Sequence, residues 1–467
     1  DLLEQRLAVD RPGGEAPVTF KAVLESRRAG AQRIIDGFVI GRESISAVTS
    51  RVFEEDPARL IRLFRHMQQF DVEPDLELKV KVRQSLHLVT PAFIRSEDAN
   101  RAFRAVLQSV GHVYPALALM HELRLLGKFM PEFGELTCLV QHELYHRYTA
   151  DIHTLKTIRQ ADAVFAGADD ACRHYGQVIR DAATPALLYL MLLLHDIGKS
   201  VSIKDHNTIG VRLARPILER LGLKTEHREL VLFIIANHLE MARFWQRYDV
   251  DDPRTTAKFV HLIGDDERLR HLYVLTFCDA QGTADGLWNG YKDALHRQLY
   301  RNTREAFDED EAVLRQRRKE DRAMIQQEVT ALIGNSLPED QVEAHFNLLP
   351  ERYFLQHSAE EIALHMRMIN QLLEKISQAD SLNTLVPALN WRDDPNQGFS
   401  VVTIITWDRA GLFFKLAGAF TVAGVNILST KAVSRSDHIT IDTFCVVDPG
   451  GGGLSNPPAR TLFLEQL

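Results

Sequence analysis

Two residues at the end of one apolar segment have the types needed to bind a divalent metal ion. His195 and Asp196 follow the run LLYLMLLL, and Gly198 comes shortly after the pair. The run predicts a helix buried on most sides, with Thr184 as its N-cap, Pro185 at its first position and its end near Gly198. A carboxylate at such a buried helix end is costly unless it is paired or bound to a cation. Adjacent imidazole and carboxylate groups can bind one divalent ion together.

Four further residues have the same chemical types, and together with the pair they make the prediction of metal binding more specific. In chain order they are His153, His206, His238 and Asp279. His238 and Asp279 each follow an apolar stretch that predicts a helix, so both are expected to be buried. A buried aspartate without a partner is improbable. With the pair, the chain therefore offers six candidate ligands.

The expected number of metal ions depends on two of these histidines. If His206 and His238 point inward, the ligands could hold two metals bridged by Asp196. If they do not, the remaining four residues suffice for one metal, and Asp205 and His206 form an exposed loop pair. The sequence favours two metals.

Other side chains near these six residues give weaker indications of a functional role. Lys199 follows the pair and would extend a cation towards a phosphate, although an ordinary surface lysine fits the sequence equally well. His146 shares a segment with His142 and lies seven residues before His153, on roughly the same helical face, so we expect a structural role for it. Upstream histidines are interpreted as ordinary surface or core residues: His66, His87, His112 and His121.

The order of the six residues resembles the HD-domain superfamily of metal-dependent phosphohydrolases. The resemblance implies metal-assisted hydrolysis of a phosphodiester, in which the metal lowers the pKa of bound water. Asp196 and Lys199 are the catalytic candidates, because the lysine would help to offset charge on the phosphoryl oxygens. Mixed imidazole and carboxylate ligands suit Mn²⁺, Fe²⁺ or Zn²⁺, with Mg²⁺ less natural at a histidine-rich site.

Composition limits the class of protein. A chain of 467 residues is too long for one core, so two to four domains are expected. Its 45% hydrophobic and 25% charged residues are typical of globular proteins, and its net charge of −8 argues against a general nucleic-acid binder. Four scattered cysteines predict reduced thiols in a cytoplasm. We find no signal peptide and no apolar run long enough to cross a membrane, and the start without methionine suggests a fragment.

The chain is expected to be mainly α-helical, with an α/β domain at its C-terminal end. The expected parts are a helical N-terminal region over 1–138, an HD domain over 139–300, a helical extension over 301–380, a linker over 381–398 and an α/β domain over 399–467. The linker is assigned because helical periodicity is lost there while proline, aspartate and glycine accumulate.

The last part shows a strand, helix, strand, strand pattern. The strands are expected over 401–406, 425–434 and 439–447, and the helix over 412–423. With TWDRAGLFFKLAGAF near its start, this pattern resembles the ACT domain, a small regulatory ferredoxin-like fold that binds amino acids. A complete copy needs one more helix and strand, so the fourth strand is expected to be missing.

Four segments together resemble the family of bacterial PII uridylyltransferases/uridylyl-removing enzymes, the GlnD family. They read HELYHRYTADIHT, LLLHDIGK, LPERYFLQHSAEEIALHMR and TWDRAGLF. In that family one domain adds UMP to a tyrosine of the PII signal protein, the HD domain removes it, and paired ACT domains sense glutamine. The resemblance implies uridylylated PII as the substrate.

Three departures from the family pattern qualify this resemblance. No Gly-Ser nucleotidyltransferase loop with paired aspartates is found, so uridylyltransferase activity is not expected from this chain alone. The loop after HDIGK reads SVSIKDHN rather than a glycine-rich form, which leaves the choice of substrate open. A single, incomplete ACT unit leaves the regulatory response open as well.

The resemblance also implies glutamine as an effector. The turn from Asp408 to Gly411 precedes a helix N-terminus, where backbone N–H groups favour a carboxylate ligand. We expect a side chain at Gly411 to crowd that ligand. Two alternatives belong to other classes: an HD-ACT hydrolase of a small nucleotide such as guanosine tetraphosphate, and a non-catalytic ligand sensor.

Overall fold

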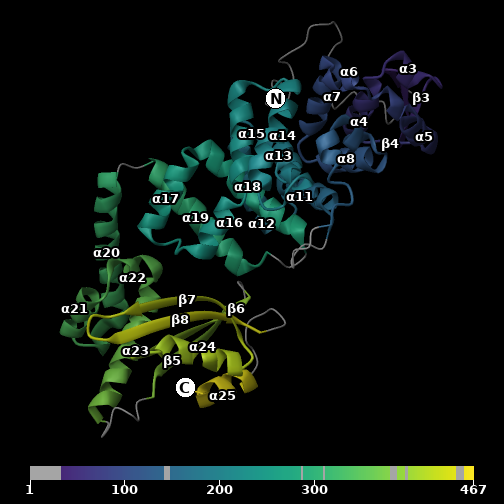
Figure 1. The fold of residues 1–467 in the computed structure, drawn as a ribbon. Helices are drawn as coiled ribbons and strands as arrows, with labels where there is room; N and C mark the ends of the chain where they lie inside the picture. The colour runs from purple at the N-terminus through teal and green to yellow at the C-terminus, as the bar shows by residue number, and fades with distance from the viewer. Residues whose placement is uncertain are drawn as a thin grey trace. The chain divides into compact units, whose positions relative to one another are not determined.

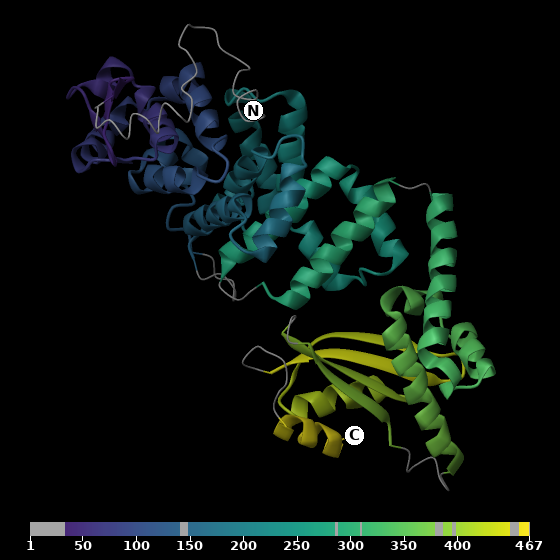
Figure 2. The same cartoon turned by 180° about the vertical axis from the view of Figure 1, so that it is seen from behind.

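The structure is a computed structural model of the chain, shown in two views in Figures 1 and 2. It describes residues 33–140, 148–284, 288–308, 311–378, 386–394, 398–448 and 457–466. The chain divides into two compact units: residues 1–241 with 270–287 form the first, and residues 242–269 with 288–467 form the second. Helices dominate among the described residues, as the sequence predicted, and each unit also contains a four-stranded sheet.

The first unit begins with a small sheet. β1 (Arg33–Ile35) and β2 (Phe38–Ile40) form a hairpin, and β3 (Ser44–Ala47) and β4 (Glu73–Pro74) complete the order β1-β2-β3-β4. The hairpin turn is Asp36-Gly37, with φ angles of 50° and 78°. Asp-Gly between apolar residues is a strong hairpin signal because both positions accept positive φ. The region expected to be helical over 1–138 therefore also contains a small sheet, which was not predicted.

Short helices follow this sheet. They are α3 (Val52–Glu55), α4 (Arg59–Phe70), α5 (Leu76–Gln84), η1 (Ser85–Leu88), α6 (Pro91–Arg95), α7 (Glu97–Leu107), α8 (Val113–Glu122), α9 (Leu125–Phe129) and α10 (Pro131–Gly134). The apolar stripe of α4 is buried, including Leu60 and Phe64. Ser96 caps α7, since its Oγ accepts a hydrogen bond of 3.2 Å from Ala99 N.

The site lies among the helices that follow in the first unit. They are α11 (Ala150–Ala166), α12 (Asp170–Arg180), α13 (Leu187–Leu194), η2 (Ile197–Ser200), α14 (His206–Arg220), α15 (Thr225–Asn237) and, from residue 270 onward, α18 (Asp266–Thr283). α13 packs against α7, α11 and α15, and all of its residues after Leu187 are buried. Its apolar circumference is thus explained by contacts on several sides.

Gly198 has a different role from the one expected. α13 ends at Leu194, and the short 3-10 helix η2 continues through Gly198. A Cβ atom added at Gly198 would lie 2.0 Å from the carbonyl oxygen of His206 and 2.6 Å from Gly210 N. Glycine is therefore required because η2 and α14 approach each other closely, and not because it ends the helix.

The second unit begins with helices and ends with a sheet. Its helices include α17 (Pro253–Ile263), α19 (Gly290–Asp308), α20 (Glu311–Ile333), η3 (Gly334–Ser336), α21 (Glu339–Leu348), α22 (Glu351–Gln356) and α23 (Ala359–Gln378), while α16 (Glu240–Arg247) spans the boundary between the units. Ser358 and Glu361 form a capping box at the start of α23, with reciprocal hydrogen bonds of 3.2 and 3.3 Å.

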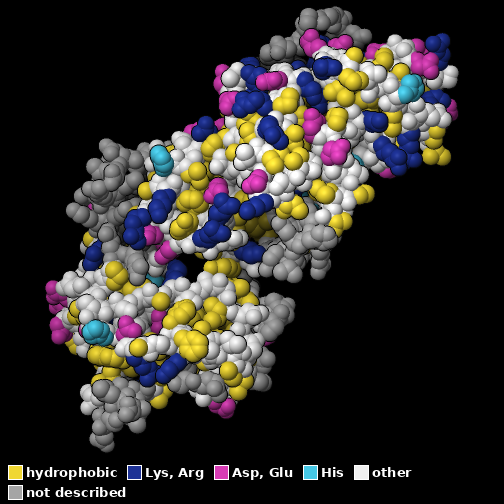
Figure 3. Space-filling model, viewed as in Figure 1, with side chains coloured by type: hydrophobic (Ala, Val, Ile, Leu, Met, Phe, Trp, Pro, Cys, Tyr) yellow, Lys and Arg dark blue, Asp and Glu magenta, His cyan; other side chains and the backbone are white. Residues whose placement is uncertain are grey.

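The C-terminal sheet is antiparallel, with the strand order β5-β6-β8-β7. Its strands are β5 (Ala388–Asp394), β6 (Phe399–Trp407), β7 (Asn426–Ser434) and β8 (Ile439–Val447). α24 (Leu412–Val422) and α25 (Pro457–Gln466) cover one face and α23 covers the other (Figures 1 and 2). Apolar side chains are visible over α24 in Figure 3, where Phe413 and Phe414 are 52% and 80% exposed.

β5 corrects the expectation of a linker before the C-terminal sheet. It lies within residues 381–398, which were expected to be a linker, and it occupies the sheet edge beside β6. The sheet therefore has four strands, although no strand follows β8 among the described residues. β5 was missed because an edge strand pairs on one side only and tolerates polar residues such as Arg392 and Asp393. The identification of this region as an ACT domain stays a prediction.

Candidate metal centre

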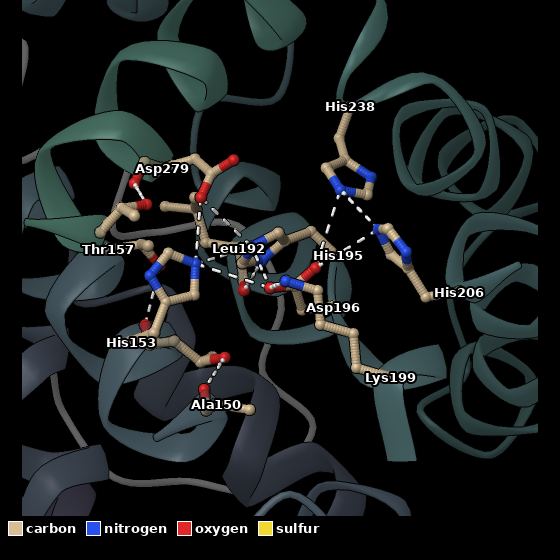
Figure 4. Close-up of polar contacts among 12 residues, drawn as sticks. Ala150, His153, Thr157, Leu192, His195, Asp196, Lys199, His206, His238 and Asp279 are labelled. Carbon is tan, nitrogen blue, oxygen red and sulfur yellow. Dashed lines mark hydrogen bonds and ion pairs between the residues drawn. The ribbon is translucent and has the colours of Figure 1, made fainter. Parts of the chain in front are cut away.

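Six side chains from separate segments of the first unit converge, as Figure 4 shows. Their potential ligand atoms form two groups: His153 with His195 and Asp279, and Asp196 with His206 and His238. Within each group the ligand atoms lie within 4.8 Å of one another. The structure thus brings together every metal ligand that the sequence analysis selected.

In the first group, two imidazoles and a carboxylate face one another. His153 Nε2 lies 3.0 Å from Asp279 Oδ1 and 3.3 Å from His195 Nε2. His153 comes from α11, His195 follows α13, and Asp279 comes from α18. Three helices therefore position the group, and its geometry depends on how they pack.

Asp196 lies between the two groups. Its Oδ2 is 3.3 Å from His195 Nε2 and 3.6 Å from His153 Nε2. Its Oδ1 is 3.7 Å from Nε2 of both His206 and His238. Each carboxylate oxygen thus faces a different group, which is the arrangement expected of a ligand that bridges two cations.

Three of the histidines are held by the same backbone contact. The Nδ1 atom of His195 lies 2.7 Å from Leu192 O, and that of His206 lies 2.7 Å from Ile203 O. The Nδ1 atom of His238 lies 2.9 Å from Ile235 O. A carbonyl only accepts, so Nδ1 of each ring donates the hydrogen bond. When these rings are neutral, Nε2 carries a lone pair directed into the centre, as a metal ligand requires.

This donor set fits divalent cations. His153 and His195 bring their Nε2 atoms within 3.3 Å of each other, and His206 and His238 bring theirs within 3.4 Å. Two nitrogen lone pairs at such distances repel unless a proton or a metal ion lies between them. Imidazole and carboxylate ligands together suit borderline divalent ions. The residues present therefore match the metal dependence that the sequence predicted.

The charges in the centre also favour bound positive charge. Burial raises the pKa of Asp196, but the positive charges of His195 and Lys199 outweigh burial and hold that pKa well below its usual value. Burial lowers the pKa of His195, yet Asp196 and Asp279 outweigh burial and raise it to about 10. Burial and the neighbouring His195 lower the pKa of His238 to about 4. The carboxylates stay ionised and attract positive charge, which protons or metal ions can supply.

Lys199 is buried and points to the centre rather than to solvent. Its Nζ lies 2.8 Å from Asp196 Oδ2, and the residue is only 8% exposed. The interpretation as a surface lysine was therefore wrong. The 3-10 turn of η2 places its ammonium beside the Asp196 carboxylate. Asp205 is exposed, whereas His206, next to it, is buried within the centre.

One supporting residue was missed. His121, interpreted as an ordinary histidine, has its Nε2 3.0 Å from Asp151 Oδ2. Burial raises the pKa of Asp151, but hydrogen bonds led by that from His121 outweigh it and lower the pKa to about 2. Asp151 lies in the first turn of α11, which carries His153, so this pair anchors a ligand-bearing helix. His142 and His146 lie outside the described residues.

The expected effector turn lies in the second unit. Asp408 N donates a 2.7 Å hydrogen bond to His438 O, and Ser434 Oγ donates one of 3.3 Å to Asp408 Oδ2. Gly411 is the N-cap of α24 with φ of +76°, and a Cβ there would meet nothing within 4 Å. Positive φ is therefore sufficient to explain the glycine.

Comparison with known protein families assigns the class. The HD domain profile matches residues 151–263, the uridylyltransferase GlnD third domain matches 38–129, and the uridylyltransferase GlnD fifth domain matches 316–368. The helical centre with its two candidate metal-binding groups is that of an HD-domain protein, a metal-dependent class. No described helix is sufficiently long and apolar to span a membrane.

Curated relatives define the family more narrowly. A protein of Azospirillum brasilense is 30% identical over 437 residues, covering 92% of this chain and 45% of the relative. A protein of Caulobacter vibrioides strain NA1000 / CB15N is 31% identical over 445 residues, covering 93% of this chain and 45% of the relative. Both are named bifunctional uridylyltransferase/uridylyl-removing enzyme. This chain belongs to the GlnD family and spans about half the length of these relatives.

Similarity to solved structures is weaker. The complex of a CCA-adding enzyme with CTP shares 12% identity at a TM-score of 0.35, covering 71% of this chain and 63% of that one. A tRNA-processing enzyme complex shares 13% sequence identity at a TM-score of 0.35, covering 56% of this chain and 65% of that one. Similarity at this level supports no conclusion about function.

Proposed function

We propose that this chain is a phosphodiester hydrolase that removes UMP from a uridylylated tyrosine of the PII protein in the cytoplasm. The observation that carries the proposal is the Asp196 carboxylate, whose two oxygens face two separate groups of candidate ligands. The names of its relatives, which include a uridylyl-removing activity, support the choice of substrate.

In this proposal the residues divide between two ions. His153, His195 and Asp279 would hold one, His206 and His238 would hold the other, and Asp196 would contribute to both. When bound, the ions supply a nucleophilic hydroxide near neutral pH and offset negative charge on the phosphoryl oxygens. The backbone contacts at Nδ1 keep the rings oriented before substrate arrives, which reduces the rearrangement needed during reaction.

Lys199 has two tasks in the proposal. Its ammonium lies 2.8 Å from Asp196 Oδ2, so it fixes the rotamer of the bridging carboxylate. Its positive charge also lies beside the reacting phosphoryl group, where it offsets charge in the transition state. Because the lysine is buried, that charge is less screened by water than a surface lysine would be.

A direct assay tests the substrate. Purified chain is incubated with uridylylated PII and, separately, with a panel of nucleotides including guanosine tetraphosphate, each with Mn²⁺, Fe²⁺, Zn²⁺ or Mg²⁺. We expect UMP release from PII with at least one metal and none in a chelator. Hydrolysis of a nucleotide but not of uridylylated PII would replace the proposed substrate, and no hydrolysis of either would leave the sensor alternative.

Regulation by glutamine is the second part of the proposal. The support is the N-terminus of α24, where Asp408 and Gly411 precede the first helical N–H groups and no side chain caps the helix. Such a helix end favours a carboxylate. For coupling, glutamine must bind the active arrangement more tightly than the resting one. Glutamine added to the PII assay should therefore increase the rate of UMP release.

A further inference from the structure

Asp162 is an acidic residue of α11 that the proposed hydrolysis does not use. It is half-buried, and both of its carboxylate oxygens accept hydrogen bonds from other segments. Oδ1 accepts from the Tyr189 hydroxyl at 2.6 Å and from Val113 N at 3.1 Å. Oδ2 accepts from Tyr114 N at 2.8 Å. One side chain therefore connects α11 with α13 and with the N-terminus of α8.

Tyr189 completes this connection from α13. The residue is fully buried, and its ring stacks on Phe165 of α11 with a centroid distance of 5.5 Å. Burial and the negative charge of Asp162 raise the pKa of Tyr189, so the hydroxyl keeps its proton and donates a hydrogen bond to that carboxylate. The same oxygen accepts a hydrogen bond of 2.8 Å from Gly111 N, two residues before α8. The contact between these two side chains is called the Asp162–Tyr189 junction below.

α8 is fastened to α11 at both of its ends. The N-cap residue of α8, His112, makes no capping hydrogen bond with its side chain, and Asp162 supplies the cap from the neighbouring helix. At the other end, His121 Nε2 lies 3.0 Å from Asp151 Oδ2. α8 belongs to residues 38–129, which lie outside the matched HD domain. Residues that precede the HD domain therefore hold a ligand-bearing helix in place.

α11 and α13 run antiparallel, so they meet at two separate places. His153 and His195 approach each other at the metal centre, with 3.3 Å between their Nε2 atoms. Asp162 and Tyr189 meet toward the opposite ends of the two helices. Asp162 follows His153 by nine residues, which is about 14 Å along a helix. Over that length, a rotation of about 4° about the junction would move His153 by about 1 Å.

We propose that Asp162 and Tyr189 are positioning residues of the metal centre. Their hydrogen bond fixes the angle between α11 and α13, and thereby sets His153 against the ligands that follow α13. The inference rests on the proposed function, because it assumes that the two groups bind metal ions. It assigns the junction to the first group, since the ligands of the second come from other segments than α11. The approach of η2 to α14 at Gly198 positions the second group instead.

Binding of Mn²⁺ to the full chain tests the proposal without any hydrolysis. The two ions are separated by one ligand variant each, because His206→Ala leaves the first group intact and Asp279→Ala leaves the second. Tyr189→Phe is added to each background, and free Mn²⁺ is measured by electron paramagnetic resonance. Phenylalanine keeps the stacked ring and removes only the hydroxyl. We expect affinity for the first ion to fall about tenfold and affinity for the second to stay within about twofold.

A second variant keeps the test independent of one substitution. The amide in Asp162→Asn has one accepting oxygen where the carboxylate has two, so it cannot satisfy the tyrosine hydroxyl and two backbone N–H groups as well. It should weaken the first ion too. Combined with Tyr189→Phe it should add little, because both changes break the same hydrogen bond. Fully additive losses would contradict a shared junction.

The matched control is Tyr273→Phe. Tyr273 is also fully buried, and its hydroxyl lies 3.0 Å from Nε2 of His174 in α12, whose described residues include no candidate ligand. This variant should lower the melting temperature by an amount similar to Tyr189→Phe and leave both Mn²⁺ affinities unchanged. Unchanged affinity for the first ion in Tyr189→Phe, or an equal loss in Tyr273→Phe, overturns the positioning role. Failure of the wild-type chain to bind Mn²⁺ would instead overturn the proposed metal centre, and this inference with it.

Discussion

A methyl group at Gly198 should disable the metal centre without changing any ligand. Gly198 lies between Asp196 and Lys199, and its added Cβ would meet the His206 carbonyl oxygen at 2.0 Å. Contacts of Cβ under 3.0 Å are essentially never seen, so η2 and α14 must separate by about 1 Å. The partner atom belongs to the backbone and no side chain can rotate away. Gly198→Ala therefore moves Asp196 away from His206.

The magnitude follows from that displacement. Overpacking of a well-packed region costs about 1–3 kcal/mol, so the free energy of unfolding should fall by this amount. A misplacement of about 1 Å at a catalytic site can reduce the rate by about 10²-fold. Asp196 Oδ1 already lies 3.7 Å from both His206 and His238, so a further separation should remove the second ion before the first.

Urea unfolding, elemental analysis of bound metal and UMP release from uridylylated PII measure these effects separately. The control is Gly418→Ala in α24, where a Cβ meets nothing within 4 Å and alanine favours the helix. It should retain metal and activity. A Gly198→Ala protein with two bound ions and a wild-type rate would refute the argument from backbone contact.

Four further predictions test other parts of the molecule. Asp196→Ala should abolish hydrolysis and bound metal while the helical circular dichroism persists; full metal occupancy would exclude the assignment. His206→Ala and His238→Ala should each lower the metal content from about two ions to about one, and unchanged content in both would make them structural. Gly411→Asp should weaken a glutamine response but not basal hydrolysis, because positive φ disfavours aspartate; calorimetry with glutamine on this chain and on a longer one checks the binding. Burial raises the pKa of Asp442 to about 6, so stability present below pH 4 is lost as pH rises through 6. Asp442→Asn should therefore stabilise at pH 7.5 by up to about 3 kcal/mol and show no gain at pH 3.5, as thermal melts at both pH values would reveal.

The sequence alone identified features whose cause is local. The caps at Ser96 and Ser358 depend on hydrogen bonds to residues three positions away, so their cause lies within a few consecutive residues. α24 begins and ends within one residue of its predicted bounds because periodicity and Gly424 mark it. The candidate ligands were selected in the same way, from a few chemical types beside apolar stretches.

Tertiary structure decided how those residues meet. Whether His206 and His238 faced inward could not be known from the sequence, because it depends on the contact of η2 with α14 and of α14 with α15. That contact in turn requires the absence of a side chain at Gly198. The sequence left Lys199 equally compatible with the surface, since nothing near it in the chain reveals that neighbouring helices bury it.

The same distinction holds in the C-terminal sheet. β5 has a polar sequence that lacks a strand pattern, and it forms a strand because β6 offers an unpaired edge. Pairing between distant strands and the close approach of helices depend on packing across the whole unit, whereas caps and turns depend on a few consecutive residues.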